Sequence, residues 1–387
     1  MMCYREFTER GVILHHPQTL ALDVRPEQIA PGVEIFPGCR ISGATASIGP
    51  DCRIGSEGPV TIVDCQLGSA VSFASGFAQE ATMLDGVTIG ANAHIRPGTL
   101  LEEQATLAHC VGLKQTLLLP FVTLGSLINF CDCLMAGGTS RSHHSEVGSS
   151  FVHFNFSPRQ DKATPSLFGD VPSGVLLDQA PIFLGGQGGV VGPLRMAYGT
   201  IQAAGSICRK DVLSPNTLIH PDPPTMPPLA TFNPGRFGNI ARMVNNNCVY
   251  IGNLHALAAW YQAVRQKTAP DDAHGQACWR GAYERLQQML TERVRQLAKL
   301  ADRLASSPDT HPSHMALVKL MAEHDFSFCG THGGPPAVLM HHIAAAQHPS
   351  HIACVQAMPA TVKTAVRNWL QAIVDKQQEK WEQFANG

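Results

Sequence analysis

The chain has 387 residues, of which 44% are hydrophobic, and its formal net charge at pH 7 is −2. This size and composition favour a globular protein with two domains, and the small charge gives no electrostatic reason to expect nucleic acid or an anionic membrane as a partner. No apolar run is long enough to span a bilayer, and charged residues such as Arg5, Glu6 and Arg10 interrupt any signal-peptide core. We therefore expect a cytoplasmic protein whose scattered cysteines are reduced thiols.

Residues 1–28 form a linker-like segment, and residues 29–214 carry a six-residue repeat of apolar side chains with Gly and Pro at the corners. The repeat is clearest in residues 83–113, where every sixth residue is Met, Ile or Leu. Such a repeat indicates a left-handed parallel β-helix, in which three short strands and three corners make a coil of about eighteen residues. The repeat blurs at residues 60–80 and 114–146, where it does not define the coils.

The C-terminal part of the chain has a different pattern. A glycine-rich run at residues 185–189 lacks the Lys-Ser/Thr ending of a P-loop and the strand-to-helix setting of a dinucleotide fold, so we interpret it as a β-helix corner. Seven prolines then predict an extended linker over residues 215–237. Residues 238–387 are expected to form an α-helical domain, because apolar residues recur at helical spacing within 279–304 and 362–373.

Two cationic residues, Arg96 and Lys114, are eighteen residues apart, so the repeat places them one above the other in successive coils. Coils stack about 4.8 Å apart. Like charges repel at that separation, which favours an anion such as a phosphate between the two side chains. The alternative is that both side chains point into solvent.

Several short motifs, in matching order over residues 9–212, resemble the C-terminal domain of the bifunctional N-acetylglucosamine-1-phosphate uridyltransferase/glucosamine-1-phosphate N-acetyltransferase family. They are residues 95–102, Gly112-Leu113-Lys114, residues 147–150, His153-Phe154-Asn155-Phe156, Lys162, Gly169-Asp170 and residues 203–212. The resemblance implies a hexapeptide-repeat acyltransferase whose substrate-binding residues are Arg96 and Lys114 at the sugar phosphate, Asn155 and Phe156 around the sugar, and Lys162. It also implies a homotrimer with acetyl-CoA as co-substrate in the groove between neighbouring β-helices, with cofactor contacts at Ala203, Ala204, Arg209 and Lys210.

The chain departs from this family in three respects. The N-terminal uridyltransferase domain is missing, so we expect no synthesis of a UDP-sugar from UTP. Twelve residues after Lys114, where the family has its catalytic His, the chain has Ser126, which has no usable basicity near neutral pH. A segment inserted between residues 132 and 155 carries His143 and His144, and a long helical region replaces the family's short tail.

Acetyl transfer needs a base that takes the proton from the attacking amine, and a His is the usual choice near neutral pH. His143, His144 and His153 are the local candidates, and a surface or structural role is the alternative for each. We expect no metal site, because residues 109–153 lack the His-x4-His pair of the zinc-binding γ-class carbonic anhydrases. Further along the chain, ligand-type residues occur without a recognisable spacing at His324, Cys329, His332, His341 and His342.

The leading functional hypothesis is an N-acyltransferase that acts on a phosphorylated amino sugar or a UDP-N-acetylhexosamine. The rival hypothesis is a non-catalytic sugar-nucleotide-binding or regulatory trimer that has kept the anion pocket and lost the base. Ser126 favours the rival, whereas the substrate-binding residues fit both. A third hypothesis is that a separately encoded nucleotidyltransferase docks on residues 9–30.

Overall fold

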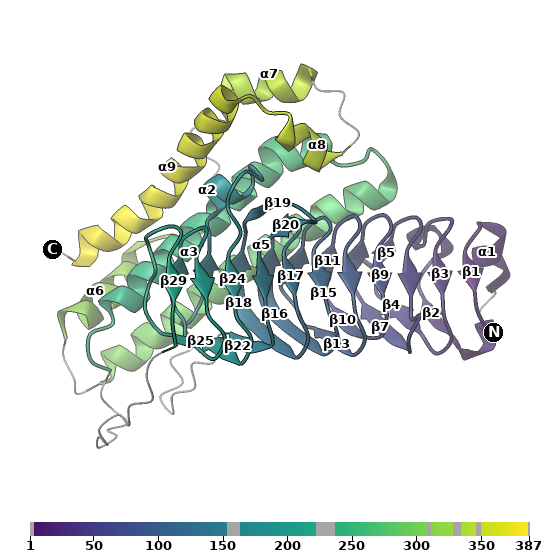
Figure 1. Cartoon of the computed structure of the whole chain (residues 1–387), viewed down its shortest axis with the longest axis horizontal. Coiled ribbons are helices and arrows are strands. Elements are labelled where there is room, and N and C mark those ends of the chain that lie inside the picture. The colour runs from purple at the N-terminus through teal and green to yellow at the C-terminus, as the bar shows by residue number, and fades with distance from the viewer. Residues whose placement is uncertain are drawn as a thin grey trace.

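The computed structural model of the chain describes residues 4–152, 163–221, 237–307, 311–327, 334–345 and 350–385. Short parallel strands between Ile13 and Ile219 wind into a three-sided β-helix, and helices between Ala241 and Ala385 pack along one side of it (Figure 1). The predicted fold class, a left-handed parallel β-helix followed by an α-helical domain, is confirmed. None of the helices in the described ranges is both long and apolar enough to cross a membrane.

The β-helix has three faces, each a stack of parallel strands. Face 1 consists of β1 (Ile13–Leu14), β3 (Glu34–Ile35), β6 (Arg53–Ile54), β9 (Ser72–Phe73), β12 (Thr88–Ile89), β15 (Thr106–Leu107), β17 (Thr123–Leu124), β21 (Glu146–Val147), β24 (Phe183–Leu184), β27 (Ile201–Gln202) and β29 (Leu218–Ile219). Face 2 consists of β2 (Ala21–Asp23), β4 (Arg40–Ser42), β7 (Val60–Val63), β10 (Gly76–Gln79), β13 (Ala93–Ile95), the first halves of β16 (Val111–Leu118) and β18 (Ile128–Met135), β22 (Ser150–Val152), β25 (Gly188–Val190) and β28 (Ile207–Cys208). Face 3 consists of β5 (Ser47–Ile48), β8 (Gln66–Leu67), β11 (Ala81–Met83), β14 (Thr99–Leu101), the second halves of β16 and β18, β23 (Ser166–Phe168) and β26 (Arg195–Met196).

Each coil crosses three edges between these faces. Edge 1/2 includes residues 108–110, 125–127 and 185–187, and edge 2/3 includes residues 96–98, 114–116 and 131–132. The glycine-rich run 185–189 therefore lies at a corner and the start of β25, as predicted. Edge 3/1 includes residues 102–105, 119–122 and 136–145, and the last of these ranges forms an antiparallel hairpin of β19 (Gly138–Ser140) and β20 (His143–His144).

Apolar side chains that point inward fill the β-helix. The six residues of the clearest repeat, within 83–113, are each no more than 1% exposed. Elsewhere the coils differ in length, because Ile41 pairs with Ile62, 21 residues later, whereas Leu67 pairs with Met83, 16 residues later. This variation explains why the six-residue repeat is blurred in the sequence around residues 60–80.

The ends of the β-helix lie outside the range 29–214 that the sequence suggests. Strands β1 and β2 fall within residues 1–28, and β29 falls within residues 215–237. The short helix α1 (Tyr4–Glu9) packs at the N-terminal end (Figure 1), and its Phe7 is buried. Short 3-10 turns at Pro17–Thr19 and Pro26–Gln28 follow in the first coil.

The C-terminal helices form a layer of their own. They are α3 (Ala241–Trp260), a π-helical turn (Tyr261–Arg265), α4 (Gln266–Thr268), α5 (Ala273–Ala305), α6 (Pro312–Glu323), α7 (Ala337–Ala345), α8 (His351–Gln356) and α9 (Ala360–Ala385), and a further helical turn, α2 (Val171–Gly174), belongs to the β-helix. The two predicted helical stripes lie in α5 and α9. α3 packs along α9, and α5 packs against α6.

Face 3 is the face that these helices cover. Its outward side chains include Leu100, Leu117, Leu134 and Leu167, which are in register on neighbouring strands and at most 2% exposed. α5 lies against β5, β8, β11 and β14, and α3 lies against β23. Strands that are apolar on both sides need cover on both sides, so this leucine ladder is the physical reason for the position of the helices.

Candidate functional site

Arg96 and Lys114 occupy equivalent positions in successive coils at edge 2/3. Ile95 pairs with Leu113 in the parallel ladder of face 2, so the residues that follow them, Arg96 and Lys114, are stacked one coil apart. Arg96 is half-buried: its Nε donates to the carbonyl oxygen of Leu113 at 3.4 Å, and its Nη2 donates to Sγ of Cys131 at 3.3 Å. Lys114 is exposed. The register thus gives the stacking that the eighteen-residue interval predicts.

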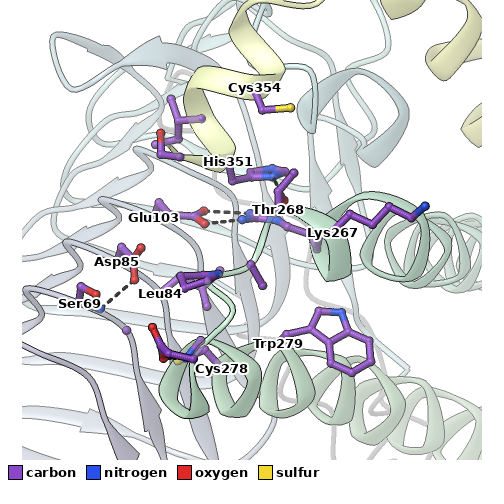
Figure 2. A pocket seen from close by; sticks show the side chains of 18 of the residues that line it. Ser69, Leu84, Asp85, Glu103, Lys267, Thr268, Cys278, Trp279, His351 and Cys354 are labelled. Carbon is purple, nitrogen blue, oxygen red and sulfur yellow. Dashed lines mark hydrogen bonds and ion pairs between the residues drawn. The ribbon is translucent and has the colours of Figure 1, made fainter. Parts of the chain in front are cut away.

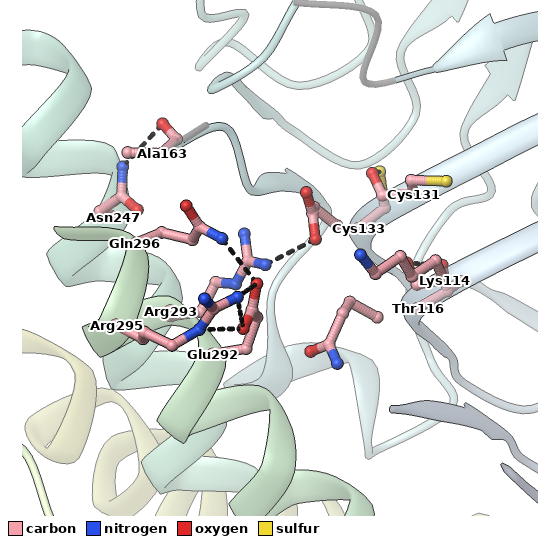
Figure 3. A network of polar contacts seen from close by, with 12 residues as sticks. Lys114, Thr116, Cys131, Cys133, Ala163, Asn247, Glu292, Arg293, Arg295 and Gln296 are labelled. Atoms are coloured by element: carbon pink, nitrogen blue, oxygen red, sulfur yellow. Dashed lines mark hydrogen bonds and ion pairs between the residues drawn. The ribbon is translucent and has the colours of Figure 1, made fainter. Parts of the chain in front are cut away.

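No carboxylate in the described ranges forms an ion pair with Arg96 or Lys114. Asp132 lies on the same edge, directly after Cys131, which is the register partner of Lys114. Its carboxylate instead accepts a hydrogen bond at 2.6 Å from Nη2 of Arg293. Figure 3 shows that Arg293 projects from a helix, α5, and this side chain is 2% exposed. Within the part of the chain that the structure describes, the two stacked cations are left without an anionic partner.

The thiol of Cys131 does not supply that anion. Burial raises the pKa of Cys131 to about 11, although Arg96 and Lys114 act in the opposite direction. The thiol is therefore neutral near pH 7, and it donates to Oδ1 of Asn129 at 3.3 Å. A bound anion would neutralise the two cations through charge-assisted hydrogen bonds.

Ser126, at the position where the resembling family has its catalytic His, contacts a histidine that the sequence analysis did not single out. Leu107 pairs with Leu124 on face 1, so His109 and Ser126 follow them to stacked positions at edge 1/2. Oγ of Ser126 lies 2.7 Å from Nδ1 of His109. The imidazole is exposed and Ser126 is half-buried. The interval of one coil between the two residues is the signal in the sequence that identifies His109.

His143 and His144 lie elsewhere on the β-helix. They belong to the hairpin at edge 3/1, whereas Arg96 and Lys114 lie at edge 2/3. Nη1 of Arg141 holds the hairpin in place by donating to backbone carbonyl oxygens of the two preceding coils, at 3.0 and 2.7 Å. Within one chain, the structure does not bring these two histidines to the cation pair.

The other predicted site residues fall into two groups. Four lie outside the described residues, and their roles stay predictions: His153, Asn155, Phe156 and Lys162. Ala203 and Ala204 follow β27 at edge 1/2, and Arg209 and Lys210 follow β28 at edge 2/3, where both are exposed. On face 2, β28 is four strand spacings from β16, which carries Lys114, and four spacings amount to about 19 Å.

A cavity of about 460 Å³ lies between edge 3/1 and the C-terminal helices (Figure 2). Arg265 forms a two-pronged ion pair with Glu103 and lies 2.8 Å from Oε2 of Glu102. Nδ1 of His351 lies 2.9 Å from Oγ1 of Thr268, and burial holds the pKa of His351 well below its usual value. None of the site residues predicted from the sequence lines this cavity.

The histidines of the C-terminal helices make separate contacts. Nε2 of His324 lies 3.2 Å from Oε1 of Gln377, and Nε2 of His342 lies 3.2 Å from the carbonyl oxygen of Cys354. In the described ranges, no three His, Cys, Asp or Glu side chains are grouped so that they could hold a metal ion. Cys329 and His332 lie outside those ranges.

Comparison with known proteins shows similarity to the bifunctional protein GlmU over about half of the chain. No family model matches the sequence. Bifunctional protein GlmU of Nitratidesulfovibrio vulgaris (strain DP4) is 28% identical over 204 residues, which cover 53% of this chain and 40% of the relative. The corresponding protein of Clavibacter sepedonicus is 27% identical over 213 residues, covering 54% of this chain and 38% of the relative.

The chain thus spans about two fifths of the length of these curated relatives. The match to a solved structure, LpxA from Acinetobacter baumannii, is 15% identical, covers 52% of this chain and 66% of that chain, and has a TM-score of 0.20. The relatives confirm the resemblance that the sequence motifs predict: over about half of its length, the chain is similar to the bifunctional protein GlmU.

Proposed function

We propose that the protein binds a phosphorylated amino sugar, or the diphosphate of a UDP-N-acetylhexosamine, between Arg96 and Lys114, and that it transfers an acyl group from acetyl-CoA to the sugar amine. The observation that carries this proposal is the pair of stacked cations without a carboxylate partner in the described residues. The similarity to GlmU supports a sugar-nucleotide substrate and an N-acyltransferase type of reaction.

Electrostatics favour an occupied site. Positive charges on neighbouring coils, whose backbones are about 4.8 Å apart, repel by up to roughly 1 kcal/mol in water, and by more beside the protein. A phosphate between Arg96 and Lys114 removes this repulsion and accepts hydrogen bonds from both side chains. Arg293 neutralises Asp132, so this carboxylate does not compete for Lys114.

The layout of face 2 supports an acyl donor that lies along it. Arg209 and Lys210 sit on the same edge as Lys114, about 19 Å away along the stack. Exposed cations at that distance suit the phosphate groups of acetyl-CoA while its thioester reaches the sugar. Ala203 and Ala204 border the face on the opposite edge, where small side chains leave room for an extended ligand.

We propose a homotrimer as the working assembly, by analogy with the resembling family. Exposed apolar side chains support an interface on faces 1 and 2: Phe183, Ile201 and Leu218 are in register on face 1 and between 42% and 52% exposed, and Phe151 and Ile207 project from face 2. Face 3 is covered by the C-terminal helices. We further propose a cytoplasmic location, and a separately encoded nucleotidyltransferase that docks near residues 9–30 as a partner.

A second candidate function rests on one residue. Ser126 stands where the family has its catalytic His, and a serine does not act as a base near neutral pH. A protein that binds the sugar phosphate without transferring an acyl group would account for Ser126 equally well. Acetyl transfer by the wild-type protein decides between the two functions.

Calorimetry with glucosamine 1-phosphate tests the anion site. Arg96→Ala and Lys114→Ala should each weaken binding by about 1.5–3 kcal/mol, the range for hydrogen bonds to charged groups. Arg40→Ala is the matched control, because Arg40 is an exposed arginine on β4 of the same face, several coils away. Equal affinity in the wild type and in both site variants would refute the phosphate site.

A further inference from the structure

The imidazole of His109 is held in one orientation by a single side chain. Its Nδ1 lies 2.7 Å from Oγ of Ser126, a good length for a hydrogen bond between an imidazole and a hydroxyl. The two residues stack in successive coils at edge 1/2, because Leu107 pairs with Leu124 just before them. In the described part of the chain, no side chain bonds to Nε2 of His109.

We propose that His109 is the base of the acyl transfer and that Ser126 positions it. This inference rests on the proposed function. It supplies the base that the serine at position 126 does not provide. The imidazole is displaced by one coil from the family's position, and the serine at that position fixes its orientation.

The contact with Ser126 is compatible with the tautomer that a base needs. A serine hydroxyl can accept a hydrogen bond, and in the tautomer that carries hydrogen on Nδ1 this atom donates to Oγ of Ser126. The lone pair of Nε2 is then left to accept a proton. A partner on one ring nitrogen also fixes the ring plane, as it does for histidines at metal sites. Both nitrogens carry hydrogen after protonation, and the bond to Ser126 persists.

His109 and Lys114 flank the same stretch of face 2. They are five positions apart in the sequence, so their Cα atoms are at most about 17 Å apart, and both side chains are exposed. The outward residue between them on β16 is Gly112, which has no side chain to occupy the face. A sugar ring over Gly112 can therefore present its phosphate to Lys114 and its amine toward His109.

The step balances with these groups. The sugar amine attacks the thioester carbonyl carbon of acetyl-CoA and forms the new C–N bond. Nε2 of His109 takes a proton from that nitrogen, the C–S bond breaks, and the departing thiolate takes the proton from the imidazolium. The products are the N-acetyl sugar phosphate and CoA, and His109 returns to its starting state.

Steady-state transfer from acetyl-CoA to glucosamine 1-phosphate, combined with calorimetry of the sugar phosphate, tests the inference. His109→Gln should lower kcat by about 10²–10⁴-fold with little change in Kd. Ser126→Ala should lower kcat by about two- to tenfold, the effect of one lost hydrogen bond. Ser126→His added to His109→Gln should restore part of the lost kcat, and His220→Gln, at an exposed histidine far along the chain, should change nothing.

The outcomes separate the inference from the function on which it rests. Wild-type turnover that His109→Gln leaves within threefold would overturn the role of His109 alone. A loss of activity that follows a matching loss of sugar-phosphate affinity would also overturn it, because His109 would then be a binding residue. No transfer by the wild type at saturating sugar phosphate would refute the acyltransferase function, and with it the role of His109.

Discussion

Replacing Arg293 with Met would test how the C-terminal helices protect the anion site. Arg293 comes from α5, is 2% exposed, and donates to Asp132 at 2.6 Å (Figure 3). Its removal takes this cation away from a carboxylate that is only 9% exposed. Breaking a buried ion pair from one side typically costs about 3–5 kcal/mol.

For Arg293→Met we expect a loss of unfolding free energy below this range of about 3–5 kcal/mol. Nε and Nη1 of Arg293 are buried without a hydrogen-bond partner, and each such group costs about 1–3 kcal/mol in the wild type. Arg293→Met removes both of these groups, so we expect a net loss of about 2–3 kcal/mol. Arg293→Met combined with Asp132→Asn removes the pair as a whole and should come within about 1 kcal/mol of the wild type.

Two assays follow these variants. All four tryptophans lie in α3, α5 and α9, so denaturant unfolding followed by tryptophan fluorescence reports the C-terminal helices. Calorimetry with glucosamine 1-phosphate reports the site, where loss of the Arg293 cation beside Asp132 should weaken binding and Asp132→Asn should restore it. A double variant as unstable and as weak in binding as the single variant would refute this account.

Three further outcomes are expected. Burial holds the pKa of His351 well below the value of about 6.5 of an unfolded chain, so the unfolded state takes up a proton first as the pH falls. The free energy of unfolding should therefore fall below about pH 6.5, by up to about 1.4 kcal/mol per pH unit. His351→Asn should reduce this slope in fluorescence-monitored unfolding, whereas His220→Asn should leave it intact. Arg265→Met should lower the unfolding free energy by about 3–5 kcal/mol, because Glu102 and Glu103 lose their buried ion-pair partner. The control Arg280→Met, at an exposed site of α5, should change it by no more than about 0.5 kcal/mol. A loss under about 1 kcal/mol for Arg265→Met would contradict a stabilising role of these ion pairs. Ile201→Glu should convert the proposed trimer to a monomer in light scattering, and an unchanged trimer mass would move the interface away from face 1.

The β-helix and the stacked cations could be predicted from the sequence because both depend on local spacing. The interval between Arg96 and Lys114 equals one full coil, so no information about the rest of the fold was needed. Coil length is a tertiary property where it varies, as between Ile41 and Ile62, and there the repeat gave no register.

The histidines show the opposite case. The sequence predicts His143, His144 and His153 as candidate bases because they are near the motif residues in sequence. The hairpin that carries His143 and His144 lies at edge 3/1, however, and does not border face 2. His109 precedes Ser126 by one coil, and only the shorter coil of 17 residues puts the two side chains in contact. The spacing of the resembling family's motif identifies position 126, but it gives no indication of His109, which contacts Ser126 in the fold.

The sequence also contains a pattern that indicates which face the helices cover. Leu100 and Leu117 each stand beside another leucine, so these strands are apolar on both sides. A strand of a solvent-facing prism alternates instead. The doubled leucines therefore mark the strands that the helices cover.

The same ladder has a consequence for biosynthesis. During translation, Leu100, Leu117, Leu134 and Leu167 leave the ribosome more than a hundred residues before α5 is complete. Until then, a strip of unshielded leucines runs along a nascent prism, and such strips promote aggregation. Completion of the β-helix is therefore not the end of its maturation, and chains that terminate before Ala305 should be clients for chaperones that bind apolar surfaces.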